Sequence, residues 1–260
     1  MIFYFSCTGN TLWAARRLAD ATHEKLVNMA SAGSQPAVRL QSGEPVGFCF
    51  PVHGWQPPHL VLDFISGLTL PAEGHYVYAL CTCGDDIGQT MDLLSTALHR
   101  RGISLNARFS LVMPESYVGL PFMDLDSPEN EQRKIVQARV TLRQIADRVA
   151  TRTHGDWNLV KGPWPWLYTH VLGGFFHRWI VTDKPFRVDA ALCVRCGLCA
   201  RVCPVGDVCA QPGQLPRWQR SGKCMSCFAC YHHCPRHAIA YGSRTRHKGQ
   251  YFMKSEEGSI

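Results

Sequence analysis

Eight of the thirteen cysteines occur in two copies of one spacing, and this repeat limits what the chain can bind. The first copy reads Cys-x2-Cys-x2-Cys-x3-Cys-Pro over residues 193–204, and the second repeats the pattern over residues 224–235. Each copy places three thiols on a tight loop and a fourth just beyond it. Such a run encloses a cubane of iron and sulfide, which needs soft ligands at tetrahedral corners. The spacing therefore predicts two [4Fe-4S] clusters.

In two-cluster folds that contain runs of this type, the fourth cysteine of each run binds the other cluster. The predicted ligand sets are Cys193, Cys196, Cys199 and Cys234 for one cluster, and Cys224, Cys227, Cys230 and Cys203 for the other. Structural zinc and disulfides are weaker alternatives. Zinc prefers two separated Cys-x2-Cys pairs, and a disulfide framework belongs to secreted chains, whereas we expect no signal peptide here.

The N-terminus predicts a second binding site. Residues 1–5 are an apolar, aromatic run suited to a buried strand, and a helix is expected to begin shortly afterwards. Between them lies a hydroxyl-rich loop that consists of Ser6, Cys7, Thr8, Gly9, Asn10 and Thr11. Backbone N–H groups at a helix N-terminus, with nearby hydroxyls, can hold a phosphate. Such helix starts are also common as simple N-caps, which is the alternative interpretation.

This loop resembles the flavodoxin phosphate loop, whose pattern is Ser/Thr-x-Thr-Gly-x-Thr, and the resemblance implies the 5′-phosphate of FMN. The Walker A pattern of nucleoside triphosphate sites does not occur in the chain. Cys7 occupies the free position of the pattern, so its side chain is expected to fit beside the phosphate.

Three later segments predict further strands of the same sheet, over residues 47–51, 76–80 and 108–113. In flavodoxin-like sheets the flavin lies across the carboxyl ends of the strands, so the loops after these strands are expected to flank its ring. The candidate ring contacts are Pro51, Val52, His53, Gly54, Trp55, Thr82, Cys83, Gly84, Gly88 and Tyr117. For Trp55 simple packing is the alternative, and for His53 the alternative is a hydrogen-bonded loop histidine.

Beyond a helix expected over residues 129–152, the chain becomes unusually aromatic. The segment 157–181 contains Trp164, Trp166 and Trp179, but histidine, arginine, proline and glycine interrupt its apolar run, so a membrane-spanning helix is not expected. We expect this segment to be a connector that packs against both neighbouring domains. Contact with a membrane surface is the alternative.

Taken together, the chain resembles the flavodoxin–ferredoxin fusion proteins of anaerobic bacteria and archaea, the ferrodoxin or flavoferredoxin type. The resemblance implies an α/β flavodoxin-like doubly wound parallel sheet of order 2-1-3-4-5, followed by a small α+β two-cluster ferredoxin domain. The implied cofactors are FMN and two [4Fe-4S] clusters. We expect a flavodoxin-like FMN-binding domain over residues 1–155, an aromatic connector over 156–184, a 2[4Fe-4S] ferredoxin domain over 185–243 and a mobile polar tail over 244–260.

The formal net charge of +7 does not indicate a nucleic-acid partner. Two clusters with their thiolates contribute about −4, and a bound FMN phosphate about −1.5 to −2, so the loaded protein is close to neutral. No nucleic-acid-binding motif is evident. Basic side chains near the cysteine runs are expected to offset cluster charge or to bind an acidic redox protein. The cysteine usage suggests a reducing cytoplasm.

Three functions are compatible with these motifs. The main hypothesis is an electron carrier that couples one- and two-electron redox partners. The second is a flavin-dependent reductase of a small acceptor such as a quinone, nitro compound or enone, with His53, Tyr117 or His59 as proton donor. The third is a sensor that responds to cluster state. A ninth cysteine near the runs, Cys209, is expected to be a free thiol because both ligand sets are complete without it.

Overall fold

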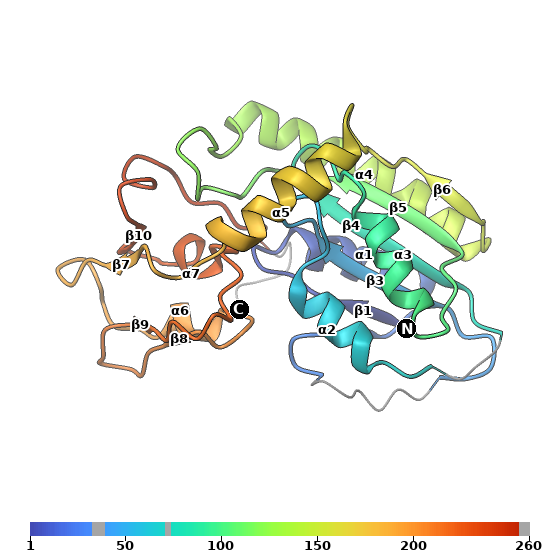
Figure 1. Ribbon diagram of the computed structural model, residues 1–260, viewed down its shortest axis with the longest axis horizontal. Helices are drawn as coiled ribbons and strands as arrows, with labels where there is room; N and C mark the ends of the chain where they lie inside the picture. The colour runs from blue at the N-terminus through green and yellow to red at the C-terminus, as the bar shows by residue number, and fades with distance from the viewer. Residues whose placement is uncertain (33–39, 71–73, 255–260) are drawn as a thin grey trace.

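The computed structural model describes residues 1–32, 40–70 and 74–254, and its N-terminal part is a parallel sheet with helices on both faces (Figure 1). Within the described ranges the sheet has six strands in the order β2-β1-β3-β4-β5-β6. This order confirms the predicted doubly wound, flavodoxin-like sheet and adds one strand at its edge. The strands are β1 (Ile2–Tyr4), β2 (Leu26–Asn28), β3 (Val46–Pro51), β4 (Val77–Cys83), β5 (Ala107–Val112) and β6 (Gly155–Trp157).

Two helices cover each face of this sheet. They are α1 (Asn10–Thr22) and α4 (Pro128–Ala150) on one face, and α2 (His59–Gly67) and α3 (Thr90–His99) on the other. Because side chains alternate along a strand, Phe3 and Phe48 pack towards α2 and α3, whereas Ile2 and Cys49 pack towards α1. The alternation gives the domain two apolar layers and fixes the strand ends at one edge of the sheet.

The sequence analysis does not locate β2, whose existence the predicted order implies, and it does not predict the edge strand β6 at all. Its three residues, Gly155 to Trp157, pair with β5 in parallel, from Ala107 opposite Gly155 to Phe109 opposite Trp157. Glycine and aspartate are poor strand formers, and an edge strand needs no continuous apolar run. The sheet therefore extends past residue 155, into the segment that we assign to the connector.

Most of the connector is a helix that crosses from the sheet to the C-terminal part of the chain (Figure 1, gold). It consists of η1 (Leu167–Leu172), α5 (Gly173–Phe175) and η2 (Phe176–Ile180), where η marks π-helical turns, and the helical backbone begins at residue 165. We call residues 165–180 the connecting helix. No helix in the described part of the chain is long and apolar enough to cross a membrane.

Gly173 lets the connecting helix approach the loop after β3 at backbone distance. A Cβ atom added to Gly173 would lie 2.5 Å from the carbonyl oxygen of Gly54, whereas one added to Gly174 would have no neighbour within 4 Å. On each side of this contact, Gln56 Nε2 donates to the Thr169 carbonyl oxygen at 2.8 Å, and His177 Nε2 lies 2.8 Å from the His53 carbonyl oxygen.

We expect Gly173→Ala to destabilise the protein and Gly174→Ala to leave it unchanged or stabilise it. The Gly173 methyl group would force the helix away from the loop, at a cost of about 1–3 kcal/mol. At Gly174 the only change is the higher helix propensity of alanine, worth about 0.5–1 kcal/mol. Thermal melts of the two purified variants test this. Equal melting temperatures would contradict the close approach of the helix to the loop.

The described C-terminal part contains two short two-stranded antiparallel sheets and two one-turn helices. Its elements are β7 (Phe186–Val188), α6 (Leu198–Arg201), β8 (Val208–Cys209), β9 (Arg217–Trp218), α7 (Ala229–His232) and β10 (Ile239–Tyr241). The first and last strands pair antiparallel, with Phe186 opposite Tyr241. Phe186, Phe228, Tyr231 and Tyr241 form the centre of a separate apolar core.

The two cysteine runs have the same backbone conformation at equivalent positions. Gly197 and Phe228 take equivalent places before α6 and α7, with φ of 71° and 58°. Two residues earlier, Arg195 and Ser226 also have positive φ, of 55° and 48°. Non-glycine residues rarely adopt this conformation. The repeat in sequence is therefore a repeat in structure.

The expectation of a mobile tail is wrong for residues 244–253. Tyr251 is 7% exposed, and its hydroxyl donates to Asn10 Oδ1 at 2.6 Å. The N–H of Met253 donates to the Thr8 carbonyl oxygen at 2.8 Å. Lys248 is also buried, and its ammonium donates to the carbonyl oxygens of Val118 and Leu120 at 3.2 and 2.5 Å. Buried hydrogen-bonded side chains thus alternate with exposed ones such as Arg246 and His247. Residues 255–260 lie outside the described part.

Candidate functional site

A cavity of about 220 Å³ lies at the carboxyl ends of the parallel strands. All the predicted contact residues except Gly9 and Gly88 line it, namely Ser6, Cys7, Thr8, Asn10, Thr11, Pro51, Val52, His53, Gly54, Trp55, Thr82, Cys83, Gly84 and Tyr117. The four loops that follow β1, β3, β4 and β5 are thus brought together at one place.

The first loop presents the N-terminus of α1 to this cavity. Gly9 precedes the helix with φ of 95°, a conformation that glycine adopts without strain. Ser6 Oγ accepts the N–H of Leu12 at 3.2 Å, and Thr11 Oγ1 lies 2.7 Å from Thr82 Oγ1. The first-turn N–H groups of an α-helix have no acceptor within the helix, so they and the cavity-lining hydroxyls fit an anionic group such as a phosphate. Gly9 and Gly88 shape the backbone without lining the cavity.

His53 and Trp55 are both held by protein contacts as well as lining the cavity. The His53 ring packs edge-on against Phe5 at 6.4 Å, and burial lowers its pKa to about 3, so the ring is neutral at physiological pH. The Trp55 ring stacks on Tyr168 of the connecting helix at 5.4 Å. One face of Trp55 is therefore occupied by the protein.

The loop after β5 adds two buried polar groups to the site, the Glu115 carboxylate and the Tyr117 hydroxyl. No sequence motif links these two residues. The Glu115 carboxylate accepts the N–H groups of Ser116 and Tyr117, both at 2.8 Å. Burial nevertheless raises the pKa of Glu115. The Tyr117 hydroxyl is buried without a hydrogen-bond partner among the described residues. This hydroxyl lies beside Gly119, 2.5 Å from where a Cβ atom would stand, so the Tyr117 ring rather than its hydroxyl lines the cavity.

Other parts of the cavity wall come from distant segments. Phe176 of the connecting helix lines it, and its ring packs against Tyr117 with centroids 5.4 Å apart. On the other side, Met225, Ser226 and Cys227 of the second cysteine run line it as well. The sequence analysis misses these residues because nothing local in the sequence places them near the sheet.

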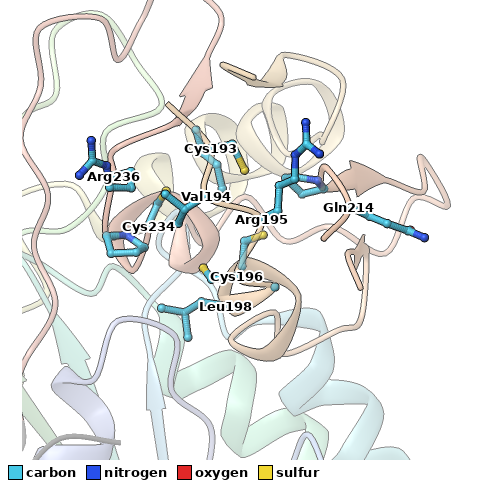
Figure 2. A pocket seen from close by; sticks show the side chains of 13 residues that line it. Cys193, Val194, Arg195, Cys196, Leu198, Gln214, Cys234 and Arg236 are labelled. Atoms are coloured by element: carbon cyan, nitrogen blue, oxygen red, sulfur yellow. The ribbon is translucent and has the colours of Figure 1, made fainter. Parts of the chain in front are cut away.

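The eight run cysteines divide between two smaller cavities in the C-terminal part. One is lined by Cys193, Cys196, Cys199 and Cys234 (Figure 2), and the other by Cys203, Cys224, Cys227 and Cys230. These are the two predicted sets, including the exchange of the fourth cysteine between the runs. Cys209 lines neither cavity and is exposed on β8.

Backbone N–H groups lie close to several of these thiols. Among the described residues, no three His, Cys, Asp or Glu side chains are placed to hold one metal ion. Backbone N–H groups point at several sulfurs, with Asp207 N 3.3 Å from Cys203 Sγ and Ala238 N 3.3 Å from Cys234 Sγ. Such hydrogen bonds stabilise thiolates that bind a cluster. Arg195 and Arg236 line the first cavity and offset negative charge there.

Cys227 connects the thiol cavities to the large cavity, because it lines both the second thiol cavity and the site at the strand ends. Its thiol interacts with that of Cys7 in the phosphate loop, and this interaction lowers the pKa of Cys227 and raises that of Cys7. The phosphate loop and the second cysteine run therefore meet at one wall of the large cavity. The first thiol cavity lies farther out, where Cys196 is exposed.

Comparisons with known proteins agree with this division of the chain. Residues 186–235 match the family model of the 4Fe-4S dicluster domain. The C-terminal part is thus similar to an iron–sulfur domain over the whole of its two cysteine runs. No curated protein matches the chain.

Solved structures with some similarity include three from bacteria. A flavodoxin from Streptococcus pneumoniae TIGR4 is 16% identical, with 58% of this chain and 97% of that chain covered and a TM-score of 0.36. An FMN-dependent NADH-azoreductase from Bacillus anthracis is 8% identical, with 57% and 98% covered and a TM-score of 0.39. The rubredoxin oxygen:oxidoreductase of Desulfovibrio gigas is 19% identical, with 57% and 36% covered and a TM-score of 0.32. The strand order of the sheet itself defines the fold.

Proposed function

We propose that the protein transfers electrons between iron–sulfur clusters in its C-terminal domain and an FMN bound at the carboxyl ends of its sheet. The observation that carries this proposal is the position of Cys227, which lines a four-thiol cavity and the large cavity at once. A ligand of one centre would therefore touch the binding site of the other. Clusters supply single electrons, whereas a flavin accepts one or two, so the pair can couple one- and two-electron partners.

The residues of the chain would set the positions and potentials of these groups. Ser6, Thr8 and the N-terminus of α1 would hold the phosphate, and the aromatic ring of Tyr117 would pack against the flavin. Cys7 would donate its thiol hydrogen to the sulfur of Cys227. A hydrogen bond to a cluster ligand stabilises the more negative, reduced state and so raises the potential.

Electrons would enter or leave at the far end of the C-terminal domain. Cys196 is exposed there, and Arg195 and Arg236 line the same cavity. These cations would attract an acidic redox protein as the external partner. All thirteen cysteines are free thiols, which suits a reducing compartment such as the cytoplasm.

Anaerobic absorbance spectroscopy tests this function directly. After iron, sulfide and flavin have been counted, NADH, NADPH and a reduced ferredoxin are added in turn to the reconstituted protein. We expect reduced ferredoxin to bleach both the cluster and the flavin bands and the nicotinamides to bleach neither. Protein that takes up iron but no flavin would contradict the proposal.

A reductase acting on a small molecule is the second candidate, and Glu115 favours it. This carboxyl lies buried beside the cavity with a raised pKa, as a proton donor to a reduced acceptor requires. Of the donors considered from sequence, His53 and Tyr117 line the cavity, whereas His59 does not and instead lies against His177 at 5.1 Å. Rapid bleaching by NADH or NADPH, followed by reoxidation with a quinone, would support this candidate over the carrier.

A further inference from the structure

The outer face of the connecting helix, together with Trp164 before it, exposes large apolar side chains that the proposed function does not use. Trp164, Trp166, Phe175 and Trp179 are 65%, 60%, 58% and 66% exposed, and Leu167, Val171 and Leu172 are exposed beside them. Exposed apolar side chains scattered singly are normal, but a contiguous set marks an interaction site. We call these seven residues the aromatic face.

The spacing of the aromatic face shows that it is one continuous stripe. Leu167, Val171, Phe175 and Trp179 follow one another at intervals of four residues. An α-helix has about 3.6 residues per turn, and the π-type turns of η1 and η2 widen it, so residues four apart lie almost directly above one another. The stripe therefore runs along the helix, on the outside of the molecule.

The opposite side of the same helix is fixed to the protein. Thr169 is fully buried, and its hydroxyl donates to the Trp55 carbonyl oxygen at 3.1 Å while accepting the N–H of Gln89 at 2.8 Å. Gly173 contacts Gly54, as described above. The helix cannot turn to bury its aromatic face without breaking these contacts. The face is thus held outward by the fold.

The segment that carries the aromatic face has charge of one sign, although Asp86 of the loop after β4 lies near Tyr168 at its N-terminal end. Residues 158–182 contain no aspartate or glutamate. The exposed cations Arg178 and Lys184 flank the face at its C-terminal end, and the Arg178 guanidinium lies 5.3 Å from the Trp179 ring centroid. The adjacent acid, Asp183, is 5% exposed and accepts the N–H of Arg220 at 2.7 Å. It therefore contributes little negative charge at the surface.

We propose that the aromatic face binds the surface of an anionic phospholipid bilayer, with the connecting helix lying in the plane of the interface. Tryptophan favours this environment because its ring is apolar and its N–H is polar, and here tryptophans stand at both ends of the stripe with aliphatic residues between them. The exposed cations at the C-terminal end of the face, Arg178 and Lys184, complement anionic headgroups. The protruding side chains of the aromatic face can insert among lipid headgroups, which adapt to their shape, whereas a protein partner would need a complementary groove.

Membrane binding would place the redox site next to the bilayer. Phe176, on the inner side of the connecting helix, lines the large cavity, and a helix with its side chains is about 10 Å across. The cavity would then lie within about one helix diameter of the lipid headgroups. Binding itself does not depend on the proposed electron transfer and can be tested separately.

Flotation of the loaded protein with lipid vesicles tests the proposal. We expect binding to vesicles of equal parts phosphatidylglycerol and phosphatidylcholine, and at least tenfold weaker binding to phosphatidylcholine alone. The triple variant Trp166→Ser, Phe175→Ser, Trp179→Ser should lose at least tenfold in affinity. The charge variant Arg178→Glu, Lys184→Glu should lose the preference for phosphatidylglycerol.

The matched control removes three exposed apolar side chains elsewhere, by Phe122→Ser, Val136→Ser and Val140→Ser, which are 82%, 52% and 46% exposed. Val136 and Val140 lie on α4, on the other side of the sheet from α3, and Gln89 at the start of α3 contacts the connecting helix. Because these two positions lie away from that helix, this variant should bind as the parent does. Circular dichroism and iron content check that every variant is folded. Quenching of tryptophan fluorescence by brominated lipids needs no substitution and should accompany binding.

Failure of the unmodified protein to float with anionic vesicles would overturn the proposal and leave the aromatic face to a protein partner. Equal loss of binding in the triple variant and its control would also overturn it. The same holds for binding without quenching by brominated lipids, since the tryptophans would then not enter the interface.

Discussion

Replacing Cys193 and Cys234 with alanine together should remove one cluster and leave the other, whereas replacing Cys193 and Cys203 together should remove both. The reason is the division of the thiols between two cavities. Cys193 and Cys234 line the same cavity although they belong to different runs, while Cys203 lines the other. A site that has lost one ligand no longer holds its cluster, so the loss of a second ligand from the same site removes no further iron.

Iron and sulfide analysis after anaerobic reconstitution measures the outcome. We expect about eight irons per chain in the parent, about four in the Cys193/Cys234 variant and almost none in the Cys193/Cys203 variant. Cys209→Ala is the control, because this thiol is exposed and lines neither cavity. It should retain the iron content of the parent.

The opposite ranking of the two double variants would show that each run binds its own cluster with its own fourth cysteine. In that arrangement Cys193 and Cys203 would share a site, so their joint loss would leave about four irons. The experiment thus distinguishes two connectivities that the sequence spacing alone allows. Equal loss in both double variants would instead mean that neither cluster assembles without the other.

The predictable parts of this molecule are those whose signal is local. Residues 47–51 and 76–80 are apolar runs that parallel strands require, and both lie in strands of the sheet, β3 and β4. The cysteine spacing is equally local, because the thiols of one run come from adjacent turns. Their exchange between the runs follows from a general rule for two-cluster folds.

The parts that could not be predicted depend on contacts between distant segments. Phe176 and Met225 line the same cavity from different domains, and no periodicity in either segment indicates this. Tyr251 belongs to a polar stretch, yet it is buried because Asn10 accepts its hydroxyl hydrogen. Edge strand β6 lacks the apolar run by which strands are recognised. In each case tertiary packing, rather than local preference, determines the structure.

Substituting Thr8 should show whether the N-terminal loop holds a phosphate. Thr8 is 6% exposed and lines the large cavity, and its hydroxyl donates to Ser116 Oγ at 3.2 Å. We expect Thr8→Asp to weaken FMN binding at least about 100-fold, since two like charges about 4 Å apart repel by several kcal/mol at a partly buried site. Asparagine has nearly the same shape as aspartate but no charge, so Thr8→Asn should weaken FMN binding no more than about tenfold.

Riboflavin separates the charge effect from any local distortion, because it has the same ring but no phosphate. If the loop binds the phosphate, the aspartate and asparagine variants should bind riboflavin with nearly equal affinity, while their affinities for FMN differ at least about tenfold. Fluorescence titration of protein that has been stripped of flavin measures both ligands. Equal FMN affinities in the two variants would place the phosphate elsewhere. A hydroxyl-rich helix start would then be an N-cap alone, and the argument for FMN would rest only on the strand order and the shape of the cavity.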